Sequence, residues 1–214
     1  MDTVTTIGPD IAKSVFQVHG IDAEGEIVIR QQLKRARVLA FFKKLQPCVV
    51  GIEACASSHY WARELTALGH AVRLIPPADV KPYVKRQKND AADAEAICEA
   101  VRRPNMRFVP IKMPEQQAGL VLHRTRHLFV RQQTAVINAI RAHLAEFGIV
   151  APLGRNGVEQ LAGVINDRKD NRIPDLVRTC LMALRIQLDM LREQIRILDR
   201  RLLGGIARMR RASG

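Results

Sequence analysis

Aromatic side chains are scarce in this sequence, which has one tryptophan, two tyrosines and six phenylalanines among its 214 residues. Proteins that bind single-stranded nucleic acid commonly stack the bases on aromatic rings. With so few rings, base stacking is not the mode of binding that we expect. If this protein binds a nucleic acid, charge is the more promising source of affinity.

Cysteine is also rare, and its four copies are scattered at Cys48, Cys55, Cys98 and Cys180. No two of them have the spacing of zinc ligands, and nothing suggests a disulfide framework. We therefore interpret them as small core residues of a reducing compartment. The sequence shows no signal peptide, no long apolar run and no lipidation motif. Together these absences predict a cytoplasmic protein.

Basic residues, in contrast, are abundant. The chain has 34 Lys and Arg against 21 Asp and Glu, which gives a net charge of +13. Residues 1–112 have a net charge of +5, from 17 basic and 12 acidic groups, and residues 113–214 have +8, from 17 and 9. Such an excess favours a nucleic acid as partner. The second half is the stronger candidate for holding its backbone.

The first hundred residues alternate between strand and helix patterns. Strands are expected at 3–8, 14–19, 26–30, 48–52 and 71–75, and helices at 33–45, 60–68 and 90–103. The first three strands form an antiparallel meander, and each later strand is preceded by a helix. This order is that of a ribonuclease-H-like α/β fold, in which helices flank a mixed sheet.

The second half is expected to be helical, with one basic helix over 114–147 and a short helix inside a loop at 154–172. The last helix has apolar residues spaced alternately four and three apart, at Val177, Leu181, Leu184, Leu188, Leu191, Ile195, Leu198 and Leu202. This heptad seam predicts a coiled coil. The seam could join two copies of the chain into a homo-oligomer, or it could pack on the basic helix as a hairpin.

Four acidic residues could converge at one end of the sheet. Asp10 follows the first strand and Glu53 ends the fourth, while Asp90 and Asp93 share one face of a helix start. Acids in a first turn are common, since they suit the helix dipole. The functional alternative is a site for a pair of Mg²⁺ or Mn²⁺ ions, which would relieve the repulsion between the carboxylates.

Two groups of basic residues are candidates for contact with phosphates. The first precedes the acidic helix, at Lys81, Lys85, Arg86 and Lys88, and the second lies on the predicted basic helix, at Arg124, Arg126, Arg131 and Arg141. The alternative role of the first group is to offset the negative charge of the acids, without binding a nucleic acid.

Several motifs occur in a defined order along the chain. They are residues 8–13 (GPDIAK), 59–65 (HYWAREL), 75–77 (IPP), 80–85 (VKPYVK), 88–96 (KNDAADAEA), 107–110 (RFVP) and 123–126 (HRTR). In these motifs the chain resembles the DEDD transposases of bacterial insertion-sequence family one-ten and their invertase relatives. The resemblance covers about residues 3–150 closely and the coiled coil more loosely.

This resemblance implies a RuvC-like nuclease fold in which Asp10, Glu53, Asp90 and Asp93 are catalytic and bind divalent metal. It also implies recombination between element DNA and target DNA, with a noncoding RNA as guide. On this interpretation residues 1–112 form the catalytic domain, 113–153 a basic helix, and 154–214 a loop and a coiled-coil helix.

The sequence departs from the family pattern in two respects. Family members have a C-terminal domain with a serine nucleophile, and Ser57, Ser58 and Ser213 are not in its motif. We therefore expect nucleic-acid binding without strand exchange from this chain. Pro9 replaces an aliphatic residue, and because proline lacks a ladder donor, we expect the first strand to end or bulge before Asp10.

Three functions remain open from the sequence. The first is an N-terminal part of an RNA-guided transposase or site-specific recombinase that transfers phosphoryl groups with metal. The second is a catalytically inactive remnant that binds nucleic acid and oligomerises. The third is a sugar-kinase or actin-like ATPase, which would need Gly-rich phosphate loops, whereas Gly8 and Gly51 are isolated.

Overall fold

The structure is a computed structural model that describes residues 3–84 and 90–212, with side chains as far as Gly204. It consists of two compact units, Met1–Pro114 and Glu115–Gly214. The first unit contains a sheet of five strands, which are β1 (Thr6–Ile11), β2 (Val15–Ile21), β3 (Ile27–Lys34), β4 (Val49–Glu53) and β5 (Ala71–Ile75). In space their order is β3-β2-β1-β4-β5.

The sheet is mixed, as the sequence predicts. The first three strands pair antiparallel, and β4 and β5 join parallel to β1. The turn before β3 is held by Asp22, whose Oδ1 accepts hydrogen bonds from the backbone N–H groups of Gly25 and Glu26 at 2.9 and 2.8 Å. This order of strands, with helices on both faces, confirms the expected α/β fold of the ribonuclease-H type.

Strand β1 continues through Pro9, which pairs with Val18 in an unbroken register. The N–H of Ala12 donates to the carbonyl of Val15 at 3.1 Å. Because hydrogen-bonded pairs alternate along an antiparallel ladder, the pair that Pro9 forms with Val18 is a non-hydrogen-bonded one, so that the missing N–H of Pro9 interrupts no bond to β2. The expected end or bulge before Asp10 is therefore wrong.

The helix expected at 33–45 is shorter in the structure, where α1 spans Val38–Phe42 after a 3-10 turn at Arg35–Arg37. The residues before it extend β3, and Leu33 pairs with Phe16 of β2. Pairing along the sheet thus prevails over the helical spacing of apolar residues in this segment.

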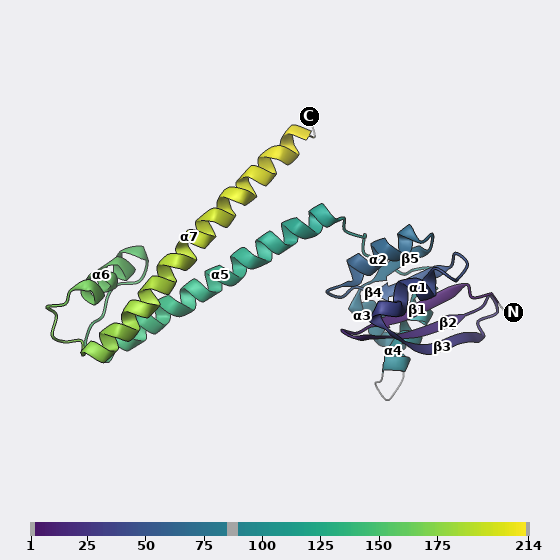
Figure 1. Cartoon of the computed structure of the whole chain (residues 1–214), viewed down its shortest axis with the longest axis horizontal. Coiled ribbons are helices and arrows are strands. Elements are labelled where there is room, and N and C mark those ends of the chain that lie inside the picture. The colour runs from purple at the N-terminus through teal and green to yellow at the C-terminus, as the bar shows by residue number, and fades with distance from the viewer. Residues whose placement is uncertain (1–2, 85–89, 213–214) are drawn as a thin grey trace. The chain divides into compact units, whose positions relative to one another are not determined.

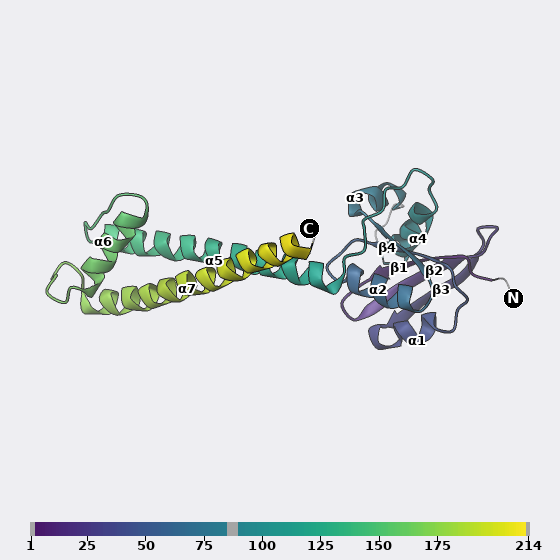
Figure 2. The same ribbon diagram turned by 90° about the horizontal axis from the view of Figure 1, so that it is seen from above.

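Helices cover both faces of the sheet (Figure 2). On one face lie α1 and α2 (Ser58–Ala67), and a core that includes Phe16, Phe42 and Trp61 is buried beneath them. On the other lies α4 (Asp90–Val101), after the short α3 (Pro77–Val80) and a 3-10 turn at Lys81–Tyr83. The face under α4 has its own apolar cluster, with Ile97 fully buried in it.

The second unit consists of three helices, α5 (Pro114–Ala145), α6 (Arg155–Asn166) and α7 (Asp175–Ala212). Helix α6 packs near the end where α5 and α7 meet (Figure 1). The first half of the heptad seam, including Leu181, Leu188 and Leu191, is buried against α5 and α6 within the chain. Later seam positions such as Leu198 and Leu202 are only half buried, so that oligomerisation through the seam stays a prediction.

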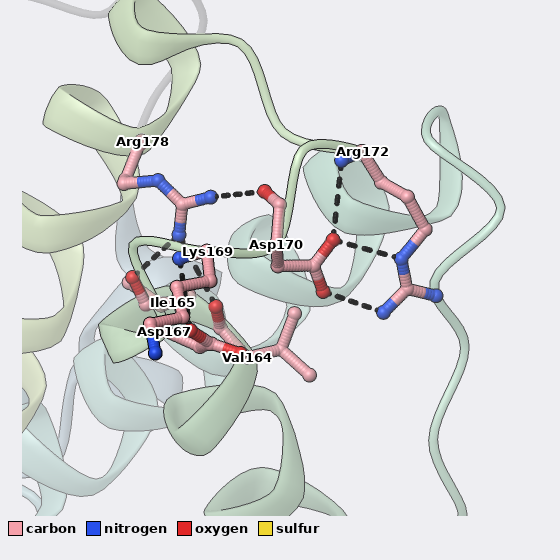
Figure 3. A network of polar contacts seen from close by, with 7 residues as sticks. All are labelled: Val164, Ile165, Asp167, Lys169, Asp170, Arg172 and Arg178. Carbon is pink, nitrogen blue, oxygen red and sulfur yellow. Dashed lines mark hydrogen bonds and ion pairs between the residues drawn. The ribbon is translucent and has the colours of Figure 1, made fainter.

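Arg178, on the first turns of α7, ties this helix to the end of α6 (Figure 3). Its guanidinium donates to the carbonyl oxygens of Val164 and Ile165 at 3.2 and 2.9 Å, and to that of Asp170 at 2.6 Å. The carboxylate of Asp170 in turn pairs with Arg172 at 2.6 Å. The loop between the two helices is thereby fixed by charged hydrogen bonds.

Within the described ranges, none of the helices combines the length and the apolar character needed to cross a bilayer.

Candidate functional site

Asp10 and Glu53 come from neighbouring parallel strands. Ile7 of β1 lies beside Val50 of β4, and each acid follows its strand partner by three residues. Because β1 and β4 run in the same direction, both carboxylates belong to the same end of the sheet. Asp10 and Glu53 are each half buried there.

Two glycines allow α4 to lie unusually close to this part of the sheet. A Cβ added to Gly8 would lie 2.4 Å from the backbone nitrogen of Cys98, and one on Gly51 would lie 2.7 Å from another residue of α4. Side chains alternate between the two faces of a strand. Asp10 and Glu53, each two residues after one of these glycines, therefore project from the face that α4 covers.

The direction of α4 brings its first turn to Asp10. Gly8 packs against Ala94 and Cys98 of the helix. Two strand residues advance about 6.6 Å, which corresponds to roughly four residues of an α-helix. Asp90 lies one turn before Ala94, and Asp93 directly precedes Ala94. The offset of about 6 Å from Ala94 back to Asp90 along α4 thus matches the distance between Gly8 and Asp10 along β1.

Three of the four predicted acids form a compact cluster. Asp10, Asp90 and Asp93 each offer a carboxylate oxygen, and these oxygens lie within 4.8 Å of one another. Asp90 is exposed, whereas Asp10 and Asp93 are half buried. Glu53 is outside this group of three, although its charge still acts on Asp10.

The environment of Asp10 disfavours its negative charge. Burial raises the pKa of Asp10 from 3.8 to about 6, and the charges of Asp93, Asp90 and Glu53 act in the same direction. A divalent cation would reverse this effect, because it compensates the carboxylates that repel one another. Closely spaced carboxylate oxygens are also the donors that Mg²⁺ and Mn²⁺ prefer. The cluster therefore fits a divalent metal.

The first basic group falls partly outside the described residues. Lys81 is exposed in the 3-10 turn that follows α3. Lys85, Arg86 and Lys88 lie outside the residues that the structure describes, so that their role stays a prediction.

The second basic group lies on α5, and its members have different surroundings. Arg124 and Arg131 are exposed. Arg126 pairs with Asp199 of α7, and Arg141 donates to two carbonyl oxygens in the loop before α6. Two of these four arginines thus hold the second unit together, and the other two are exposed on its surface.

Comparison with known proteins gives a consistent result. A family model described as "Transposase", for DEDD transposases of the IS110 type, matches residues 7–149. A probable family 20 transposase of Pseudomonas aeruginosa is 48% identical over 212 residues, which is 97% of this chain and 63% of that protein. The putative transposase y4pF/y4sB of Sinorhizobium fredii is 44% identical over 95% of this chain and 52% of its own length.

A third relative is the transposase for insertion sequence element IS1328 of Yersinia enterocolitica, 39% identical over 97% of this chain and 61% of the relative. The chain thus spans between about half and two thirds of the length of the curated relatives it matches. The matched residues 7–149 contain all four acids, Asp10, Glu53, Asp90 and Asp93.

Proposed function

Because this chain belongs to the IS110 family of DEDD transposases, we propose that it acts in DNA transposition through a divalent-metal site at the end of its sheet. The observation that supports this most directly is the cluster of Asp10, Asp90 and Asp93, with Glu53 on the adjacent strand. The reaction class is phosphoryl transfer on element and target DNA.

Asp10, Asp90 and Asp93 would hold Mg²⁺ or Mn²⁺, and Glu53 would approach from β4. The metal would stabilise negative charge on the phosphate oxygens of the reacting DNA. Half burial of Asp10 reduces the water around its carboxylate, which strengthens its attraction to a cation. Asp90 and Asp93 both lie in the first turn of α4, so that one short segment supplies two of the carboxylates.

Binding of the DNA itself would depend on exposed basic side chains. Lys81 lies in the unit of the acidic site, and Arg124 and Arg131 lie on α5. We extend this proposal to Lys85, Arg86 and Lys88, which directly precede the acidic helix in the sequence. A guide RNA and a homo-oligomer formed through α7 are parts of the same proposal, supported by the family resemblance and the heptad seam.

Metal binding tests the proposal directly. Isothermal titration with Mn²⁺ should show binding to the wild-type protein and a decrease in affinity of at least about tenfold in Asp93→Asn, in the range known for altered metal surroundings. Asp175→Asn is the matched control, because Asp175 also occupies a first helical turn but lies in the other unit. Equal affinity of all three proteins would refute the metal site.

DNA binding separates the proposal from its alternative, an inactive remnant that binds nucleic acid. Labelled duplexes from the flanks of the gene, and scrambled duplexes, would be titrated with wild type and Asp93→Asn, with and without Mn²⁺. A transposase should bind the flanking DNA more tightly when metal is present, and Asp93→Asn should lose that difference. If the affinity for DNA changes neither with Mn²⁺ nor with the substitution, the result would support the inactive remnant.

A further inference from the structure

A cavity of about 640 Å³ lies in the second unit, between α5, α6 and α7. Its charged wall consists of four arginines, Arg141, Arg155, Arg192 and Arg196, and a single acid, Glu159. The amide side chains of Gln133 and Asn138 also line it. The described lining is therefore strongly positive and rich in hydrogen-bond donors.

Two of the arginines shape the cavity. Arg141 of α5 donates to the carbonyl oxygens of Ala151 and Pro152 at 2.8 and 2.7 Å, which holds the loop before α6. Arg192 of α7 pairs with Glu159 of α6 at 3.0 Å. These contacts join three separate helices around the opening. The guanidinium of Arg141 bonds to neutral carbonyl groups, so that its positive charge still contributes to the potential of the cavity.

The other two arginines are available to a ligand. Arg155, at the start of α6, is exposed and makes no ion pair or side-chain hydrogen bond with residues that the structure describes. Among the described residues, Arg196 pairs only with Glu193 on its own helix, and its side chain is 71% exposed. Such an exposed pair is weak in water, so that a stronger anion can displace it.

The start of α6 adds to the positive potential. The helix begins after Gly154 without a side-chain cap, and its first turn contains no acidic residue. Gly154 and Arg155 both line the cavity. The uncapped N–H groups of a first turn attract anions, so that they reinforce the arginines.

We propose that this cavity binds phosphodiester groups of a nucleic-acid backbone, through Arg155 and Arg196. The inference rests on the proposed action on nucleic acid and adds an anchoring site to it, in a unit remote in sequence from the four acids. A guanidinium binds phosphate with two parallel hydrogen bonds, which suits arginine over lysine in such a site. A volume of several hundred Å³ accommodates a ligand of nucleotide size.

A polyanion fits better than a single free phosphate for a reason of charge distribution. Arg124 and Arg131 are exposed on α5, the helix that also supplies Arg141 to the cavity. Residues 113–214 have a net charge of +8 as a whole. A backbone with a charge at every nucleotide can use these arginines and the cavity at once, whereas inorganic phosphate can use only the cavity.

The test compares three double variants. Arg155→Ala/Arg196→Ala removes the two available charges from the cavity. Arg155→Lys/Arg196→Lys retains them without the forked geometry. Arg168→Ala/Arg201→Ala is the matched control, since both of its arginines are exposed in the same unit and neither lines the cavity. Circular dichroism would verify that each variant is folded.

Anisotropy titrations with a labelled duplex DNA and a labelled stem-loop RNA, repeated over a salt series, provide the measurement. For duplex DNA, the plot of log affinity against log salt has a negative slope, whose magnitude should decrease by about 0.9 for each phosphate that the protein no longer neutralises. We expect the magnitude of the slope to decrease by nearly twice this amount in the cavity Ala variant. The Lys variant should have a slope near that of wild type, and the control should change less than the cavity Ala variant.

The outcomes distinguish the sources of the phosphate. A reduced slope with DNA alone, with RNA alone or with both identifies the backbone that the cavity binds. Binding that is weakened by millimolar inorganic phosphate while the slopes stay equal would overturn the inference in favour of a small-anion site. Equal slopes in both Ala variants also overturn it and leave the proposed function intact. A wild-type protein that binds neither nucleic acid overturns both.

Discussion

At Asp10, burial and neighbouring negative charges both oppose ionisation of the carboxyl group. The pKa of Asp10 is about 6 in the folded protein and exceeds the ordinary value of 3.8. As pH rises, the Asp10 carboxyl group therefore loses its proton at a lower pH in the unfolded chain than in the folded protein. As pH rises from about 4 to about 6, the free energy of unfolding therefore decreases. Asp10→Asn should raise the free energy of unfolding by about 1 kcal/mol at pH 7.5 without metal, after allowance for the solvent around a half-buried group.

At pH 4 the same substitution should have little effect on stability, because the carboxyl group is then protonated in the folded protein. Thermal unfolding in chelator at both pH values measures the difference. Added Mn²⁺ should stabilise the wild type and leave Asp10→Asn unchanged. A stabilisation of Asp10→Asn that is equal at both pH values would show that charge is not its cause.

Gly8 and Gly163 offer a contrast between two glycines. A Cβ on Gly8 would meet backbone atoms of α4 at 2.4 and 2.5 Å, whereas one on Gly163 of α6 meets nothing within 4 Å. Gly8→Ala should therefore destabilise the protein by about 1–3 kcal/mol and weaken metal binding by displacing α4. Gly163→Ala should stabilise it by roughly 0.5–1 kcal/mol, because alanine favours the helix.

Urea unfolding of the two variants, together with a Mn²⁺ titration, checks both values. If Gly8→Ala retained wild-type stability and metal affinity, the close approach of β1 and α4 would not position the acids.

For the candidate site, the sequence could predict how residues close together in one helix are placed. Asp90 and Asp93 are three apart on a helix, which fixes their common face before any fold is known. Arg126 and Arg141 show the limit of such reasoning. Their partners, Asp199 and the loop at 151–152, are distant or irregular in sequence, so that composition alone could not reveal that both arginines are engaged inside the chain.

At the scale of elements, the heptad seam of α7 is buried to different extents in its first and second halves. Leu188 is buried within the chain, whereas Leu198 and Leu202 are half buried near the far end of the described side chains. If the protein forms a homo-oligomer through this seam, the later positions should contribute most of the interface between copies. Leu198→Lys/Leu202→Lys should then lower the molar mass measured by light scattering.

The neighbouring Leu203 provides a control for this prediction. It is 68% exposed and does not belong to the heptad. Leu203→Lys should leave the molar mass unchanged. The same mass for all three proteins would leave the hairpin with α5 and α6 as the sole role of the seam.

Elements also differ in how well the sequence predicts them. Regular spacing over many residues made the long helices α5 and α7 predictable. The helix predicted to begin at residue 33 was wrong over its first residues, because the apolar side chains there suit a helix as well as a strand. The strand conformation depends on pairing with β2, between residues such as Phe16 and Leu33 that are 17 positions apart.

For the whole molecule, the net charge of +13 predicts binding that weakens steeply with salt. The triple variant Lys85→Ala, Arg86→Ala and Lys88→Ala should lower affinity about equally for unrelated DNA sequences, since phosphate contacts carry no sequence information. On duplex DNA, the salt slope should flatten by about 0.9 for each phosphate contact that these substitutions remove. Metal affinity near Asp90 should rise slightly, because nearby positive charge is removed.

Anisotropy titrations over a salt series, on two unrelated duplexes, measure these effects. A wild-type slope in the triple variant would mean that these residues only offset the charge of the acids.

At the scale of the whole molecule, the order of elements along the sequence was enough to predict the mixed sheet. The cavity between α5, α6 and α7 was not predictable, since its arginines come from three segments whose proximity depends on packing.

The contacts of Arg178 couple the local unfolding of two segments of the second unit, the end of α6 and the beginning of α7. Its guanidinium donates hydrogen bonds to carbonyl groups at the end of α6. In most helices such terminal carbonyl groups bond to water or to a capping residue. The end of α6 consequently cannot fray unless the beginning of α7 releases its arginine. Backbone amides in these two segments, which are separated by a loop, should therefore exchange their hydrogens with solvent as one cooperative unit.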